Sequence, residues 1–346
     1  MALLWIEGFE GYGTTTGTDI TTLVLARGYV GTSGLRLATG RISGYSLFYN
    51  SAGTGATVKT PPLTTDPTLI VGCAFYFPGT QFTAGIYLYY NAVLGINVIF
   101  DPATASTITV KLGNTTLAIY SGFTTLFNTN VWYYLEVKVY CHASAGTVEV
   151  RLNGTTIMSG GALSGINTQA GAEAYYNVVS LWTSLYSHID DIYICDGSGS
   201  IANDFQGVCR VLGIFPNADT ATEQWTPNSG AVHYDRVAEN PPDGATTYVS
   251  SSTQAQIDLY YYPALVGAST IVGIQINSQV ILQAGTSVII ESPIVSNSVI
   301  DLGPDVQVYW TAAYADTRHI SMTDPNTDAP WTIANLAAAQ IGVQVM

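Results

Sequence analysis

Positive charge is scarce in this sequence. Its 346 residues include three Lys and seven Arg against 24 Asp and Glu, which gives a formal net charge of −14. Neutralising the phosphates of a nucleic acid takes Lys and Arg, and so does binding to an anionic membrane surface. We therefore expect neither nucleic acid nor an anionic membrane among the partners of this protein.

Long apolar runs and a secretion signal are also missing. No window approaches the ~20 unbroken apolar residues of a membrane-spanning helix. The first seven residues carry no basic side chain, and Glu7 and Glu10 stand where a signal peptide would still be apolar. We expect a protein that is made in the cytoplasm and is not inserted into a membrane.

Cysteine is rare and scattered. The chain has four, at Cys73, Cys141, Cys195 and Cys209, and none forms a CxxC pair. Zinc sites and disulfide frameworks show closer, repeated spacings. The sequence predicts four buried thiols that act as small apolar side chains.

Strand and turn residues dominate instead. Thirty-four Gly and 14 Pro separate short runs rich in Val, Ile, Tyr, Phe and Thr, a pattern typical of strands joined by turns. In the first part of the chain we expect strands at Thr68–Phe77, Ile86–Tyr90, Ala92–Phe100, Thr107–Leu112, Thr116–Tyr120, Thr147–Leu152 and Ile189–Cys195. In the second part we expect them at Gln256–Tyr262, Ile271–Ile276, Ser287–Ile290, Gln307–Ala312 and Ile341–Val345.

The clearest strand is Val131–His142. Its apolar residues Leu135, Val137 and Val139 alternate with Glu136, Lys138 and Tyr140. Such alternation predicts one buried and one polar face. Two dipeptides that favour tight hairpins, Gly113-Asn114 and Asn153-Gly154, mark turns between neighbouring strands.

The fold class follows from this spacing. Short strands every 8–12 residues or so predict an all-β protein, and we expect two β-sandwich (jelly-roll) domains at residues 1–207 and 225–346, with a linker at 208–224. One helix is expected near the end, capped by Thr332 and carrying Ile333, Leu336 and Ala337 on its apolar face. A final strand follows it.

Residues 1–200 resemble a known fold family. The stretches VWYYLEVKVYCH (131–142), VEVRLNG (148–154) and IDDIYI (189–194) are similar to the core strands of concanavalin A-like lectin and laminin-G-like jelly rolls. The resemblance implies that the first domain is a sandwich of this kind.

A second resemblance covers much of the chain in patches. The opening MALLWIEGFEGYG, the segments DDIYICDGSG, NDFQG and DRVAENPPDGATTYVSSS, and the tail TDPNTDAPWTIANLAAAQIGVQVM resemble virion proteins of tailed bacteriophages. This resemblance implies a non-catalytic structural protein that is assembled on the particle in the host cytoplasm. Its partners would be other virion proteins and copies of itself, with a trimer as the candidate symmetry.

A pair of carboxylates would indicate glycanase activity, because lectin-like sandwiches also host glycanases and these need two carboxyls at a set separation. The E-x-D-x-x-E string of that fold family does not occur in this sequence. Asp190 and Asp191 are adjacent, so on a regular strand they would point to opposite faces. Glu136 and Glu149 lie on polar faces, and we expect them to face solvent or an interface.

Other chemistry finds little support. The sequence has no G-x-S-x-G elbow, and each His lacks a local Ser or Cys partner. The loop Asp196–Ser200, with Asn203 and Asp204 after it, offers oxygen ligands for calcium, but we favour a plain loop there and at Asp301–Asp305. The glycine-rich run Gly11–Gly17 misses the phosphate-loop spacing. We expect no catalytic residue, cofactor or metal. The four histidines are His142, His188, His233 and His319.

Aromatic residues leave saccharide binding open, because it needs exposed aromatic faces beside polar groups. Core or subunit-interface positions are the favoured interpretation of these residues. We predict a virion structural protein, acting in capsid decoration or in the tail or fibre. The alternative is a glycan-binding or glycan-degrading adhesin for the host surface. The saccharide candidates are Tyr175, Tyr176, Trp182, Tyr186, Tyr260, Tyr261 and Tyr262.

Overall fold

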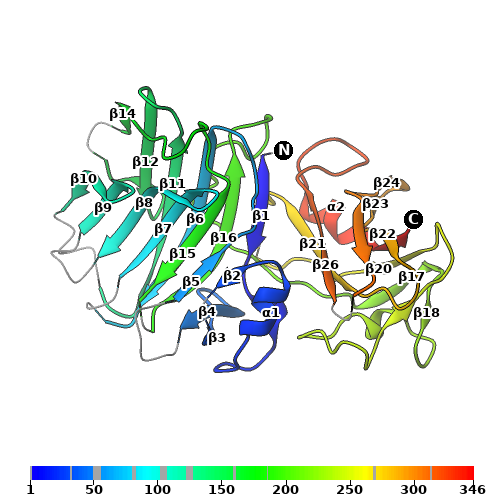
Figure 1. Cartoon of the computed structure of the whole chain (residues 1–346). Coiled ribbons are helices and arrows are strands. Elements are labelled where there is room, and N and C mark those ends of the chain that lie inside the picture. The colour runs from blue at the N-terminus through cyan, green and yellow to red at the C-terminus, as the bar shows by residue number, and fades with distance from the viewer. Residues whose placement is uncertain are drawn as a thin grey trace. The chain divides into compact units, whose positions relative to one another are not determined.

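The computed structural model divides into two compact units, Met1–Leu212 and Gly213–Met346 (Figure 1). It describes residues 2–31, 33–49, 56–79, 83–101, 107–121, 128–158, 161–184, 186–267, 270–311 and 314–346. Both units are built almost entirely of antiparallel strands. The prediction of an all-β fold is confirmed.

The first unit is a sandwich of two sheets. Sheet A has nine strands, which run from β13 (Thr155–Thr156) through β12 (Gly146–Leu152), β11 (Val131–Tyr140), β6 (Thr68–Phe77), β16 (His188–Asp196) and β4 (Tyr45–Tyr49) to β3 (Leu35–Thr39), with β1 (Leu3–Glu7) beside β16 and β14 (Leu163–Ile166) beside β12. Sheet B has seven, in the order β10 (Thr115–Tyr120), β9 (Thr107–Leu112), β8 (Val93–Asp101), β7 (Ala84–Tyr90), β15 (Val178–Thr183), β5 (Ala56–Lys59) and β2 (Val30–Gly31).

The inner faces of the two sheets share one core. Phe77 and Tyr133 of sheet A lie against Phe100 of sheet B, with ring centroids 4.8 and 5.6 Å apart. Edge-to-face contacts of this kind are the favoured geometry for buried aromatic rings. The alternation predicted in β11 is confirmed on this side, because Leu135, Val137 and Val139 are all fully buried. The predicted hairpins at Gly113-Asn114 and Asn153-Gly154 are also present.

Two short helical turns in this unit were not predicted. They are the 3-10 turn η1 (Glu10–Tyr12) and the helix α1 (Thr21–Ala26). Each is too short to show a helical period in the sequence. Helix α1 is fixed by tertiary contacts instead, since Val24 is fully buried in the core.

The prediction that Asp190 and Asp191 point to opposite faces is wrong, because β16 contains a bulge at this point. Asp190 pairs with Ala74 of β6 and Tyr193 pairs with Gly72, so β16 holds one extra residue here, and Asp191 has a left-handed φ of 50°. A bulge breaks the two-residue alternation of a strand. Both carboxylates therefore converge on Arg41: Asp190 Oδ2 accepts from its backbone N at 2.7 Å and Asp191 Oδ2 from its Nε at 2.6 Å.

The segment 204–211, which we call the strap, lies against residues on the outer side of sheet A. Its backbone N–H groups donate to side chains of the sheet, Gly207 to Glu136 Oε1 at 2.9 Å and Val211 to Asp191 Oδ1 at 2.7 Å. Arg41 Nη2 also donates to the carbonyl of Cys209 in the strap. The strap is thus held by side chains of three segments of the unit.

The sequence predicted that Glu136 faces solvent or an interface. In the structure it is buried instead. Its exposed fraction is 0%, and its Oε1 accepts from the hydroxyl of Tyr193 at 2.5 Å as well as from the strap. The alternating pattern is correct, but the strap covers the polar face at this point. Glu149 remains half-buried and forms an ion pair with Arg151 at 3.1 Å.

The cysteines mostly follow the prediction. Cys73, Cys141 and Cys195 are buried and Cys209 is half-buried, and all four are free thiols. Within the described residues, no helix is long and apolar enough to span a membrane.

The second unit is built on one seven-stranded sheet. Its main path is β17 (Ala218–Glu223), β20 (Ile257–Tyr261), β27 (Gln340–Val345), β22 (Ser287–Glu291) and β25 (Val306–Tyr309), and β23 (Ile294–Ser296) pairs with both β27 and β24 (Val299–Asp301). Two ribbons complete the unit, β18 (Thr226–Pro227) with β19 (Val249–Ser250) and β21 (Ile274–Val280) with β26 (Ala315–Ser321). A 3-10 turn, η2 (Tyr234–Arg236), follows β18 in the chain.

The predicted helix of this unit is confirmed as α2 (Ile333–Ala338), and Thr332 Oγ1 accepts from the backbone N of Asn335 at 3.1 Å. Most predicted strands are also present, although β21 lies three residues further along than expected, and Ala312 of the predicted strand Gln307–Ala312 is outside the described residues. Strand β17 was missed and falls inside the predicted linker 208–224. Its residues Ala218–Glu223 are poor strand formers, and pairing with β20 holds them extended.

One glycine of the second unit is required by a close backbone approach. A Cβ at position 342 would lie 1.8 Å from the backbone oxygen of Asp258 on the neighbouring strand. We expect Gly342→Ala to lower the stability of this unit by about 3 kcal/mol or more. Hydrogen exchange should then become faster across β20 and β27. Gln344→Ala, on the same strand, is the control, and unchanged protection in Gly342→Ala would contradict the expectation.

Candidate functional site

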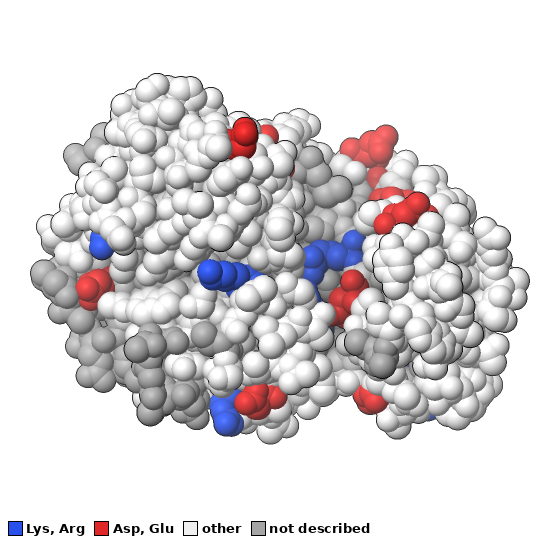
Figure 2. All heavy atoms as spheres, in the orientation of Figure 1, with Lys and Arg blue, Asp and Glu red and all other residues white. Residues whose placement is uncertain are grey.

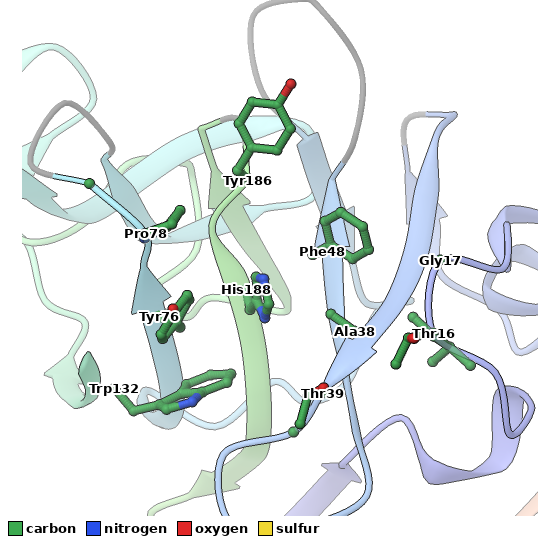
Figure 3. Close-up of a pocket in the computed structure, with 13 residues that line it drawn as sticks. Thr16, Gly17, Ala38, Thr39, Phe48, Tyr76, Pro78, Trp132, Tyr186 and His188 are labelled. Carbon is green, nitrogen blue, oxygen red and sulfur yellow. The ribbon is translucent and has the colours of Figure 1, made fainter. Parts of the chain in front are cut away.

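Four ring-bearing residues form a row across the outer face of sheet A. Trp132 of β11 pairs with Tyr76 of β6, Tyr76 pairs with His188 of β16, and His188 pairs with Phe48 of β4. Directly paired residues on adjacent antiparallel strands project from the same face. We call these four residues the aromatic row (Figure 3).

The rings of the row contact one another in sequence. Centroid distances are 5.4 Å from Trp132 to Tyr76, 4.9 Å from Tyr76 to His188 and 5.4 Å from His188 to Phe48. Neighbouring planes are tilted by 39° to 47°. All four side chains are half-buried, so the row presents ring surface to solvent while its position is fixed by its neighbours.

The row forms the floor of a depression of about 970 Å³. Tyr186 and Pro78 lie toward one end of it, and Thr16 and Gly17 lie beyond strand β3 (Figure 3). Among the described residues that line this depression, none is Lys, Arg, Asp or Glu. The depression therefore combines an aromatic floor with uncharged walls. Such a composition suits a ligand that has apolar ring faces and hydroxyl groups.

His188 supplies an oriented polar group in the middle of the row. Its Nδ1 lies 3.3 Å from Ser46 Oγ, and Ser46 donates its own proton to the carbonyl of Thr39 at 2.9 Å. Because the Ser46 proton is engaged, Nδ1 of His188 must be the donor in its bond to Ser46. Nε2 is then unprotonated and can accept a hydrogen bond. Burial lowers the pKa of His188 to about 4, so the ring is neutral at physiological pH.

The other polar groups of the row complement this acceptor. The hydroxyl of Tyr76 donates to Asn130 Oδ1 at 2.9 Å, which leaves its oxygen free to accept. The indole N–H of Trp132 makes no hydrogen bond to any described residue. The row thus offers one ring donor and two acceptors between apolar ring faces.

Comparison of the sequence with known proteins does not assign this chain to a family. No family model matches the chain, and no curated protein matches it. Several solved structures resemble it at 9% to 13% identity. They include the VIP36 exoplasmic/lumenal domain in its Ca²⁺/Man3GlcNAc-bound form (13% identity, 50% of this chain and 84% of that chain, TM-score 0.35). Carbohydrate binding module CBM66 from Bacillus subtilis (11%, 49% and 96%, 0.33) and lectin II from Ulex europaeus (9%, 55% and 97%, 0.34) are further examples.

These likenesses are too distant to carry an argument about function. The names of the three proteins describe a domain bound to Ca²⁺ and Man3GlcNAc, a carbohydrate-binding module and a lectin, and each match covers about half of this chain. None of the three bears on a virion location, which stays a prediction.

The sequence-based saccharide candidates are mostly elsewhere. Of them, only Tyr186 lines the depression. Tyr176 and Tyr260 are buried, Tyr175, Trp182 and Tyr262 are half-buried, and Tyr261 is exposed. Trp132, Tyr76, His188 and Phe48 were not singled out, because the pairing that aligns them is invisible without the strand order.

The remaining candidates have structural partners. His233 Nδ1 lies 2.7 Å from Asp258 Oδ2, His319 Nδ1 lies 2.7 Å from the carbonyl of Ser292, and His142 Nδ1 accepts from two backbone N–H groups of its own turn. In the loop Asp196–Ser200 and after it, where we expected a plain loop, Asp196 accepts from Ser198 and Thr64, and Asp204 pairs with Lys138 at 2.9 Å. Within the described part of the chain, no group of three His, Cys, Asp or Glu is placed to hold a metal ion.

A cluster of carboxyls lies around Arg41, next to Gly40 at the edge of the depression. Burial raises the pKa of Asp190 and Asp191, the charge of Asp191 raises that of Asp190 further, and Arg41 opposes both shifts. Burial and the charge of Asp190 raise the pKa of nearby Glu10 to about 10. Glu10 is therefore protonated at neutral pH.

This protonation predicts how stability depends on pH. An unfolded Glu titrates near pH ~4.3, so between about pH 4 and pH 10 Glu10 holds a proton in the folded first unit that it loses in the unfolded chain. This one group should lower the stability of the unit as pH rises through this window, by up to about 1.4 kcal/mol per pH unit. Glu10→Gln, which mimics the protonated acid, should flatten the profile and be the more stable form at pH 8–9.

Denaturant unfolding read by hydrogen exchange in β6 and β16 measures this effect. Glu149→Gln, which alters a carboxyl outside the cluster, is the matched control and should leave the slope unchanged. Parallel pH profiles for Glu10→Gln and the unmodified protein would show that Glu10 is not the group responsible.

Proposed function

We propose that the first unit is a non-catalytic saccharide-binding module, and that its ligand lies across the strands on the aromatic row. The observation that carries this proposal is the alignment of Trp132, Tyr76, His188 and Phe48 by direct strand pairing. Sugar rings present apolar C–H faces and peripheral hydroxyls. The row offers aromatic faces with an oriented acceptor at His188 and a donor at Trp132, which is the complementary chemistry.

The dimensions of the row indicate an oligosaccharide. Adjacent strands lie about 4.8 Å apart, so four strands place the outer rings roughly 14 Å from each other, enough for about three linked sugar rings. A single monosaccharide would cover only part of the row. Affinity is therefore expected to rise with chain length up to about three residues.

The absence of catalysis is part of the same proposal. Hydrolysis of a glycosidic bond by the usual route needs two carboxyls beside the bond, and the described residues lining the depression include neither Asp nor Glu. The buried carboxyls Asp190, Asp191 and Glu136 are held by Arg41, Tyr193 and the strap. A bound oligosaccharide should accordingly be recovered intact.

A glycan array followed by hydrogen exchange tests this function. The full-length protein is applied to immobilised oligosaccharides, and each bound one is then added in solution. Slower exchange in peptides that contain Tyr76, Trp132 and His188 is expected. Lack of binding to any glycan, or protection confined to the second unit, would refute the proposal, and release of reducing ends would refute its non-catalytic part.

We also propose a setting for this activity, a tailed-bacteriophage virion. The support is the sequence resemblance of the quoted segments, with self-association, in a trimer as the candidate symmetry, and other virion proteins as further partners. In that setting the first unit would attach the particle to host-surface saccharide. Cryo-electron microscopy of the intact particle tests the location: density on a tail or fibre supports adhesion, density on the head lattice supports decoration, and no density refutes both.

A further inference from the structure

The charge around the depression restricts its ligand further. No described lining residue is charged, and on the face drawn in Figure 2 the charged side chains are few. The chain as a whole carries a formal net charge of −14. A carboxylated ligand would therefore approach a protein of its own sign and find no cation at the floor of the site.

The cation closest to the row in the strand pairing keeps its charge, but it is not among the described residues that line the depression. Arg36 of β3 is the cross-strand neighbour of Phe48, but its Nη1 donates to the carbonyl of Gly17 at 2.6 Å. Hydrogen bonds from Thr21 lower the pKa of Asp19, and the charge of Arg36 lowers it further. Arg36 thus holds the 16–19 segment that flanks the depression.

The row itself disfavours an anion. The faces of aromatic rings carry partial negative charge, and the acceptor atoms of His188 and Tyr76 present lone pairs. A neutral imidazole cannot form an ion pair with a carboxylate. Moving a carboxylate from water onto this surface costs solvation, and no described lining residue carries a positive charge to offset that cost.

We propose that the site selects uncharged oligosaccharides and rejects chains that carry a uronic or sialic acid on the residues contacting the row. This proposal rests on the proposed saccharide function and names its ligand class. It follows from the lack of charged residues among the described lining and from the acceptor atoms that the row exposes.

Matched glycan pairs test the selectivity. Neutral oligosaccharides of three or more residues are compared with the same backbones carrying one carboxylated residue, by titration calorimetry at 0.15 M salt. We expect each neutral member to bind at least tenfold more tightly. Equal or tighter binding of the carboxylated members would overturn the selectivity but leave saccharide binding standing, whereas no binding by either class would overturn both proposals.

A charge variant gives a second readout. Thr39 lines the depression and its side chain is exposed, while the backbone carbonyl that accepts from Ser46 would be unaffected by a new side chain. Thr39→Lys should raise the affinity for carboxylated members by about tenfold and change that for neutral members little. Thr39→Gln, similar in reach but uncharged, is the control. If Thr39→Lys leaves the ratio of the two affinities unchanged, charge does not set the selectivity.

Discussion

Trp132→Ala is expected to weaken saccharide binding by roughly 30-fold, about 2 kcal/mol. The indole ends the aromatic row and is the largest ring in it, so its removal takes away apolar contact area and the indole N–H donor together. The rest of the row should stay in place, because Tyr76, His188 and Phe48 are aligned by backbone pairing. Titration calorimetry with the best glycan from the array measures the change.

The matched control for this variant is Trp182→Ala. Trp182 lies on β15 in sheet B, pairs with Gly85 and Thr57, and is half-buried like Trp132. It should leave the affinity within about twofold, since it belongs to the other sheet. If both variants weaken binding equally, the loss comes from a general disturbance of the sandwich and the row is not the site.

Arg41→Met is expected to lower the stability of the first unit by about 3–5 kcal/mol. Asp191 has an exposed side-chain fraction of 3% and depends on Arg41 Nε at 2.6 Å for its charge partner. Methionine leaves this carboxylate buried and unpaired, and it also removes the bond from Arg41 to Cys209 in the strap. Denaturant unfolding read by hydrogen exchange in β6 and β16 measures the loss.

Two further variants make this expectation specific. Arg151→Met breaks an ion pair with Glu149 whose side chains are 31% and 24% exposed, and such surface pairs contribute at most about 1 kcal/mol. Combining Arg41→Met with Asp191→Asn should recover much of the loss, because the unpaired charge is then gone. A cost for Arg41→Met no larger than that for Arg151→Met would show that the buried pair contributes little.

Local patterns predicted the strands well where one face is buried and the turns are short. The stretch from Val131 to Thr156 shows this, since alternation places β11 and β12 within one or two residues, and the Asn153-Gly154 dipeptide marks the hairpin from β12 to β13. The helix capped by Thr332 was predicted in the same way. Strand β17 was missed because pairing with β20, rather than its own composition, keeps it extended.

The aromatic row could not be predicted from sequence. Phe48, Tyr76, Trp132 and His188 come from four separated segments, and their alignment depends on a strand order, β11-β6-β16-β4, that follows neither chain order nor any motif. The convergence of Asp190 and Asp191 on Arg41 was hidden for a related reason. The bulge turns Asp191 toward Arg41. It depends on tertiary structure, and the regular alternation of a strand predicts the opposite orientation.

The strap has a mechanical consequence for a protein that holds a surface ligand. Tension applied to the chain beyond Leu212 reaches the bond between Val211 and Asp191 and the bond between Arg41 and Cys209 before it reaches the end of β16. The first bond loads β16 at its bulge and the second loads the segment of Arg41, so the pull is divided between two places instead of starting at the C-terminal end of β16. The sandwich, and the aromatic row on its face, should therefore keep their shape under a force that begins to extend the rest of the chain.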